Sequence, residues 1–144
     1  LWTIYKRTSA SMLTHVQEQL AKRGDGSRAV AAYSEVDSKK SIAAFLADER
    51  VVAGVFQPGS AGAGLNPQHL CWNCAFIEIP TTTIPFVQSA GRIDRKGQKF
   101  NPIIRLFVAR GTIQEKLLKN LFDNDNLVQR ASGTKQGIKN LIFP

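Results

Sequence analysis

The chain has 144 residues, close to the commonest size of one domain, and 43% of them are hydrophobic while 21% are charged. This balance excludes an intrinsically disordered chain and supplies enough apolar material for one folded core. Its 19 lysines and arginines against 11 acidic residues leave a formal net charge of +8. The excess favours a polyanionic partner such as nucleic acid, although a basic surface kept for solubility fits the composition equally well.

The cysteine content and the absence of long apolar runs indicate the cellular compartment of the chain. Cys71 and Cys74 are the only cysteines, too few for a disulfide framework. The first residues lack the pattern of a signal peptide, and no stretch reaches the roughly 20 apolar residues that span a bilayer. We therefore expect an intracellular protein, cytoplasmic or nuclear, or a viral protein that acts inside the host cell.

The apolar periodicity predicts alternating strands and helices along the chain. The expected strands cover residues 2–6, 29–33, 51–56, 75–79 and 103–109, and the expected helices cover 9–22, a segment opening at Asp37 or Ser38, 84–96 and 112–122. Thr112 and Glu115 form a capping-box pattern at the last helix. The alternation predicts a single α/β domain over residues 1–122, with one parallel sheet and helices on both faces. Residues 123–144 are expected to form an extension or tail, in which residues 124–131 fit a short helix.

The segment QSAGRIDRKGQ, residues 88–98, contains the most distinctive polar pattern. On a helix over 84–96, Gln88, Arg92 and Arg95 stand at positions i, i+4 and i+7 and share one face. Arginine's planar fork donates two parallel hydrogen bonds to phosphate oxygens and never loses its charge. The stripe therefore predicts a phosphate-facing surface. A surface helix whose arginines only face water fits the spacing as well.

A glycine-rich segment, GSAGAGLN at residues 59–66, follows the apolar run VVAGVF directly. Its glycines permit unusual backbone angles, so its amides can approach an anion or a nucleic-acid backbone. The segment is neither a P-loop nor a dinucleotide fingerprint, because it lacks both the GK[ST] ending and the G-x-G-x-x-G spacing. From this stretch alone, a flexible connecting turn is an equally good interpretation.

Taken together, the two segments resemble a known family. GAGLN followed by Q-x-x-G-R-x-x-R-x-G-Q looks like motifs V and VI of superfamily-two helicases. GRIDRKGQ with the later GTIQEKLL resembles the Swi/Snf-type translocase branch, and the likeness extends from about residue 2 to residue 120. In that family these motifs belong to the second of two RecA-like lobes, so the resemblance implies a RecA-like fold for this chain.

The resemblance also implies roles for individual residues. Arg92 and Arg95 match the catalytic motif VI arginines, the second of which usually reaches the γ-phosphate of ATP. The remaining matches are the ATP-site residues Gln88, Gly62, Gly64 and Asn66, and the nucleic-acid contacts Ser60 and the basic loop Lys6, Arg7 and Thr8 after the first strand. The implied partners are nucleic acid, with DNA favoured, and the N-terminal RecA-like lobe of the same parent protein; no membrane partner is expected.

Two departures from the Swi/Snf-type pattern concern the segment before motif VI. Residues 81–83 are three threonines where that branch usually has Trp-Asn-Pro, and Glu78 replaces the commoner aspartate. The sequence also leaves no room for the long insertion that remodeller lobes often carry. A simpler translocase or annealing-helicase-like relative fits better than a chromatin remodeller.

Two ATPase motifs are absent from the sequence. There is no G-x-x-x-x-G-K-[ST], and the only adjacent acidic pair, Asp48-Glu49, is not preceded by an apolar strand. We therefore expect the chain to be the second half of a motor, inactive alone, with ATP and magnesium held mainly by the first lobe. The alternative is a stand-alone basic module that binds nucleic acid or a protein and has no motor activity.

The pair Cys71 and Cys74 has the C-x-x-C spacing of some zinc and redox sites. His69 lies nearby, but the other histidine, His15, is distant in sequence, so four zinc ligands are not at hand. We expect ordinary, partly buried thiols and no bound metal.

Overall fold

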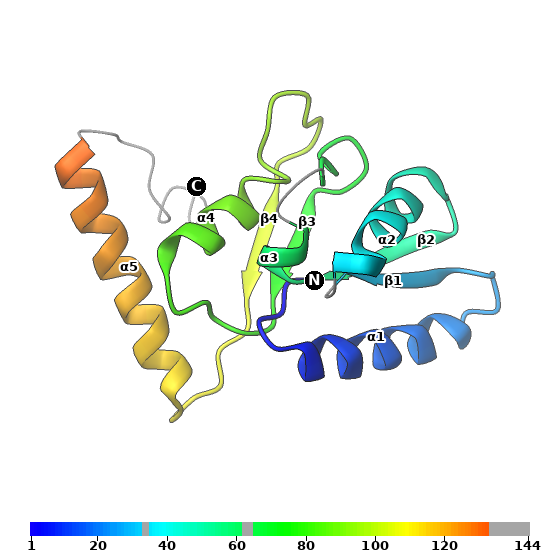
Figure 1. The fold of residues 1–144 in the computed structure, drawn as a ribbon, viewed down its shortest axis with the longest axis horizontal. Coiled ribbons are helices and arrows are strands. Elements are labelled where there is room, and N and C mark those ends of the chain that lie inside the picture. The colour runs from blue at the N-terminus through cyan, green and yellow to red at the C-terminus, as the bar shows by residue number, and fades with distance from the viewer. Residues whose placement is uncertain (33–34, 62–64, 133–144) are drawn as a thin grey trace.

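The computed structural model describes residues 1–32, 35–61 and 65–132. Its elements follow in the order α1 (Lys6–Ala21), β1 (Arg28–Ala32), α2 (Glu35–Ala47), β2 (Val51–Phe56), α3 (Pro58–Ala61), β3 (Asn73–Phe76), α4 (Thr83–Ala90), β4 (Ile103–Leu106) and α5 (Ile113–Ser132). The alternation of parallel strands and helices confirms the predicted α/β class (Figure 1). In these ranges no helix is both long and apolar enough to cross a membrane.

The strands form two parallel pairs, β1 with β2 and β3 with β4, joined through Trp2. The Trp2 amide donates to the Ala75 carbonyl at 2.7 Å, and the Thr3 amide donates to the Phe56 carbonyl at 3.0 Å. The first residues therefore lie between β2 and β3, as a central strand would.

The strand predicted over residues 2–6 is wrong beyond its first residues. Trp2 alone makes strand-type bridges, and α1 begins at Lys6 rather than at residue 9. The amides of Ile4 and Tyr5 donate to the side chain of Glu78, 74 and 73 residues away in sequence. Because these amides are bonded to a carboxylate, they cannot continue a strand ladder, and the chain turns into the helix.

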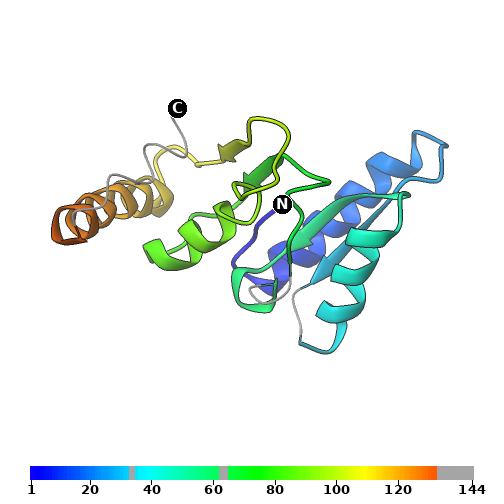
Figure 2. The same cartoon turned by 90° about the horizontal axis from the view of Figure 1, so that it is seen from above.

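Helices α1 and α2 cover the two faces of the pair β1 and β2 (Figures 1 and 2). The other half of the molecule is formed by β3 and β4 with α4 and α5, which contact each other. This arrangement agrees with the predicted helices on both faces of the sheet. The segments that connect the strands to the helices therefore lie at the two ends of the sheet, where they can carry functional side chains.

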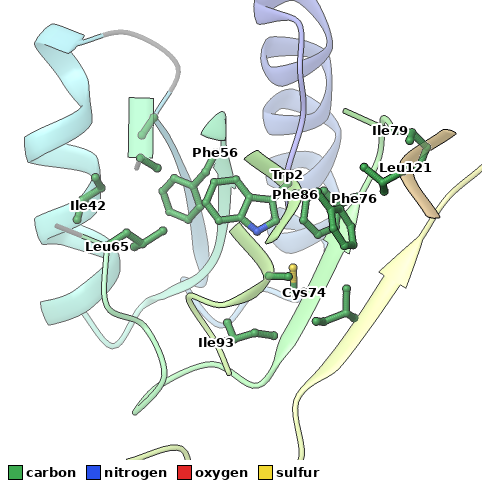
Figure 3. Packing of buried hydrophobic residues seen from close by; sticks show 14 residues of the cluster. Trp2, Ile42, Phe56, Leu65, Cys74, Phe76, Ile79, Phe86, Ile93 and Leu121 are labelled. Carbon is green, nitrogen blue, oxygen red and sulfur yellow. The ribbon is translucent and has the colours of Figure 1, made fainter. Parts of the chain in front are cut away.

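Aromatic rings fill the middle of the core. Trp2 lies between Phe56 and Phe76 (Figure 3), with ring-centroid distances of 5.9 Å and 6.3 Å. Phe86 from α4 packs on Phe76 at 4.6 Å, and neither ring is exposed to solvent. One cluster thus joins both strand pairs and α4. Leu121 of α5 belongs to the same buried cluster.

Helix α4 is shorter than predicted. It ends at Ala90, and the expected continuation to residue 96 forms a series of turns. The amides of Arg92 and Ile93 donate to the carbonyls of Ser89 and Ala90, three residues earlier, instead of four as in an α-helix. Gly91 and Gly97 in this stretch weaken helical structure. The predicted single helical face with Gln88, Arg92 and Arg95 is therefore wrong.

The last helix, predicted over 112–122, and the short helix near 124–131 form one helix, because α5 continues without a break from Ile113 to Ser132. The cap at its start also differs in detail from the predicted box. The Thr112 hydroxyl accepts from the amide of Gln114 at 3.2 Å, one residue before Glu115. The Gln114 side chain accepts from the amide of Ala109, and so ties the helix to the end of the preceding segment.

Candidate functional site

Arg92 and Arg95, predicted as the motif VI arginines, lie in the turn that follows α4, and they meet the segment predicted as motif V. The Arg95 guanidinium donates through one terminal nitrogen to Asn66 Oδ1 at 2.6 Å and through Nε to the Gly91 carbonyl at 3.0 Å. Arg92 donates to the Leu65 carbonyl at 3.5 Å. Residues 27 to 29 positions apart in sequence are thus brought into one cluster. We call residues 91–98 the arginine turn.

The electrostatics of the arginine turn suit an anion. Burial, and then the neighbouring charge of Arg95, lower the pKa of Arg92, which nevertheless stays a cation at neutral pH. Arg95 is exposed, and no carboxylate whose side chain the structure describes forms an ion pair with it. Two like charges held side by side destabilise each other, and an anion placed between them would relieve the repulsion.

The arginine turn is fastened to the segment before β3. The Gln98 side-chain amide donates to the carbonyls of Cys71 and Ile93, at 3.0 Å and 2.9 Å. Gly97 has φ +97, and a Cβ atom placed there would lie 2.7 Å from Cε1 of His69. Only glycine fits this position without strain. Sequence reasoning gave Gln98 no role, although it lies within the quoted motif, and considered His69 only as a zinc ligand.

Replacing Gly97 by alanine is expected to destabilise the fold by about 2 kcal/mol, because the side chain meets His69 and the backbone angle is unfavourable. The measurement is the free energy of unfolding in urea. Gly59→Ala is the matched control, since nothing lies within 4 Å of its added Cβ. Gly97→Ala should cost clearly more than this control. Equal stability of the two variants would show that the arginine turn is not held as described.

The other predicted ATP-site residues are placed less favourably. Gln88 is exposed on α4, and among the described residues it makes no hydrogen bond to either arginine. The structure therefore shows no contact through which Gln88 would support the two arginines. Gly62 and Gly64 lie outside the described residues. Asn66, the predicted motif V position that the structure does describe, bonds Arg95.

The predicted nucleic-acid contacts gather at the opposite end of β3. Lys6, Arg7 and Thr8 form the first turn of α1 rather than the loop that the sequence predicted. Lys6 and Arg7 are exposed, whereas Thr8 is half-buried and its hydroxyl donates to Glu78 at 2.7 Å. Figure 1 shows the start of α1 near the end of β3, while the arginine turn precedes the start of β4.

A groove of about 300 Å³ lies beside the start of α1. Its lining residues come from the segment before α1, the junction of β2 with α3, the loop before α4 and the first turn of α4: Ile4, Gln57, Pro58, Gly59, Pro80, Thr81, Thr82 and Pro85. Ser60 is half-buried on α3 and follows Gly59 of this lining. The segment before α1 and the start of α3 therefore border one groove.

The two cysteines do not form a site of their own. Burial raises the pKa of the Cys74 thiol to about 12, while the Cys71 thiol donates to the Asn73 carbonyl at 3.0 Å. In the part of the chain that the structure describes, no three histidine, cysteine or acidic side chains gather as metal ligands. At this pKa, Cys74 stays a neutral thiol at physiological pH and is a poor nucleophile.

Comparison with known proteins supports the fold. No family model and no curated protein matches the sequence. Among solved structures 55 chains are similar, including the crystal structure of the C-terminal part of the Fun30 ATPase domain. That match has a TM-score of 0.66 at 17% identity, and it covers 82% of this chain and 37% of that one. At this identity the likeness concerns the fold, which is the predicted RecA-like α/β lobe.

Proposed function

We propose that the chain is the second RecA-like lobe of an ATP-dependent nucleic-acid translocase or helicase of the Swi/Snf type. The contact of Arg95 and Arg92 with Asn66 and Leu65 is the observation that carries the proposal. It joins the two segments whose sequences resemble motifs V and VI, on a fold similar to part of an ATPase domain. The proposed ATP site lies between this lobe and a first RecA-like lobe.

In this proposal, Arg95 stabilises the transferred phosphoryl group of ATP. The charge that spreads over the phosphoryl oxygens in the transition state is met by a guanidinium that donates two parallel bonds. Magnesium and the ATP phosphates would be held mainly by the first lobe, and Arg92 would add a second positive charge. Arg95 would exchange the Asn66 oxygen for a phosphate oxygen when the lobes close.

The segment between β2 and β3 offers a route for coupling. It leaves the end of β2 at α3, beside the groove, and arrives at Leu65 and Asn66, beside the arginine turn. A change in the contacts of Arg95 can therefore act on the same stretch of chain that borders the groove. Closure around ATP and release after hydrolysis would then move this lobe along the nucleic acid.

Nucleic acid, with DNA favoured, would be bound through its backbone. Lys6 and Arg7 are exposed at the start of α1, Ser60 is half-buried on α3, and the chain carries a formal net charge of +8. Contacts of this kind supply affinity that weakens with salt and do not depend on base sequence.

The experiment that tests this function compares three samples. The chain alone and a first RecA-like lobe alone are each expected to show no ATP hydrolysis, while a protein that joins the two should hydrolyse ATP faster when nucleic acid is added. The measurement is phosphate release with and without a DNA duplex. A joined protein that folds and binds DNA but never hydrolyses ATP would instead favour a stand-alone binding module.

A further inference from the structure

Trp72 and Phe100 form an exposed aromatic pair next to the arginine turn. Their ring centroids lie 4.5 Å apart, and 38% of Trp72 and 55% of Phe100 remain exposed. Trp72 directly precedes β3 and Phe100 lies shortly before β4, so the pair lies at the end of the sheet where these two parallel strands begin. Single exposed apolar residues are common on proteins, whereas two rings in contact form a continuous apolar surface.

The side chain of Gln98 fixes this aromatic pair relative to the arginine turn. Its carbonyl oxygen accepts from the amide of Phe100 at 3.1 Å. Its amide group donates to the carbonyls of Cys71 and Ile93, at 3.0 Å and 2.9 Å. Cys71 directly precedes Trp72, and Ile93 belongs to the arginine turn. The backbone beside both rings is therefore held at a set place beside the two arginines.

Trp72 and Arg92 also line one cavity, which has a volume of about 330 Å³. Leu65 and Leu70 contribute apolar walls, and Arg92 is the charged side chain among the described residues of this lining. Sites for small molecules typically have volumes of about 300 Å³ or more, mostly apolar walls and a few polar groups. The cavity therefore has the size and the composition of a site for a small, flat molecule that carries negative charge at one end.

We propose that the adenine base of ATP stacks on Trp72 in this cavity, while the phosphates extend toward Arg92 and Arg95. The inference rests on the proposed function and adds the base to the parts of ATP that this lobe contacts. A nucleotide combines a flat ring with an anionic chain, and the cavity and the arginine turn present a ring surface and two guanidinium groups. Stacking needs only the face of the base, so the site supplies affinity without selecting one base.

A base of single-stranded nucleic acid presents the same flat ring, but the position of the cavity favours ATP. Trp72 lies before the start of β3, whereas the predicted nucleic-acid contacts Lys6, Arg7 and Thr8 lie near the other end of that strand (Figure 1). Arg92 instead joins the cavity to the arginine turn, where the phosphates of ATP are proposed to bind.

The first test measures tryptophan emission of the 144-residue chain, excited at a wavelength that adenine does not absorb. Millimolar ATP should quench the emission, whereas tripolyphosphate, which has the charges but no base, should not. Trp72→Phe should lose most of the quenching, because the remaining tryptophan, Trp2, is buried in the core. The proposal would be overturned by ATP that does not quench, by equal quenching with tripolyphosphate or in Trp72→Phe, or by stronger quenching with a single-stranded oligonucleotide.

The second test uses the protein that joins this chain to a first RecA-like lobe. Trp72→Ala should raise the KM for ATP about tenfold, because a stacking contact made throughout the reaction is lost, and kcat should stay within about twofold of the wild type. Phe107→Ala is the matched control, since Phe107 is also an exposed aromatic residue and lies outside the cavity lining. Its KM should be unchanged.

The outcomes separate the base site from the proposed function. If Arg95→Ala abolishes hydrolysis while Trp72→Ala keeps the wild-type KM, the ATPase function stands and the base site is rejected. An equal rise of KM in Phe107→Ala would also reject the base site. If the joined protein hydrolyses no ATP, the proposed function is rejected, and quenching of Trp72 by ATP still decides whether the cavity binds the base.

Discussion

Substitution of Arg95 by alanine is expected to lower nucleic-acid-stimulated ATP hydrolysis by about 10³-fold or more, in a protein that joins this chain to a first RecA-like lobe. The physical reason is that alanine leaves the charge of the transferred phosphoryl group without its guanidinium partner. Binding of ATP should change far less, because most contacts to the nucleotide are expected from the first lobe. The measurement is the rate of phosphate release at saturating ATP and DNA.

The structure offers a closely matched control for this experiment. Arg105 on β4 is also exposed and also donates to an asparagine, Asn73, at 3.1 Å. Arg105→Ala removes the same side chain and the same kind of bond without changing Arg95 or Asn66, so its rate should stay near that of the wild type. Arg95→Lys keeps the charge but loses the two-pronged geometry, and should remain strongly impaired. If the Arg95→Ala variant hydrolysed ATP at the wild-type rate, the role of Arg95 at the transferred phosphoryl group would be rejected.

Phe76→Ala is expected to destabilise the domain by about 3–5 kcal/mol, which is a large share of the stability of a typical domain. Phe76 is fully buried and packs against Trp2 and Phe86, so its removal leaves a cavity at the point where the two strand pairs and α4 meet. The measurement is the free energy of unfolding in urea, followed by circular dichroism.

Phe107→Ala provides the comparison for the core substitution. Phe107 follows β4, and 54% of its surface is exposed. Removal of an exposed ring should change stability by no more than about 0.5 kcal/mol. A similar cost for Phe76 and Phe107 would mean that the aromatic cluster is not the centre of the core.

The alternation of elements could be predicted from sequence because it depends on local apolar patterns. The run VVAGVF is apolar at every position of β2, and the prediction of residues 51–56 matches the observed strand. The first strand could not be predicted correctly, because its end is decided by Glu78, which is remote in sequence. Local propensity carries no information about such a partner.

The candidate site was predictable in composition but not in geometry. The motif resemblance identified Arg92, Arg95 and Asn66, and the structure bonds Arg95 to Asn66 and Arg92 to the neighbouring Leu65. The helical face that was expected to align the arginines does not exist, since α4 ends at Ala90. Gly91 disfavours a helix but keeps helical backbone angles, so the presence of a glycine there does not by itself mark the end of the helix. The link from Gln98 to Cys71 likewise joins segments 27 residues apart.

The most direct test of the central claim is a structure of the joined two-lobe protein with an ATP analogue that mimics the transferred phosphoryl group. The account predicts that the Arg95 guanidinium leaves Asn66 and binds the oxygens at the γ-phosphate position, within hydrogen-bond distance. A structure in which the lobes close on the nucleotide while Arg95 remains bonded to Asn66 and faces away would contradict the account.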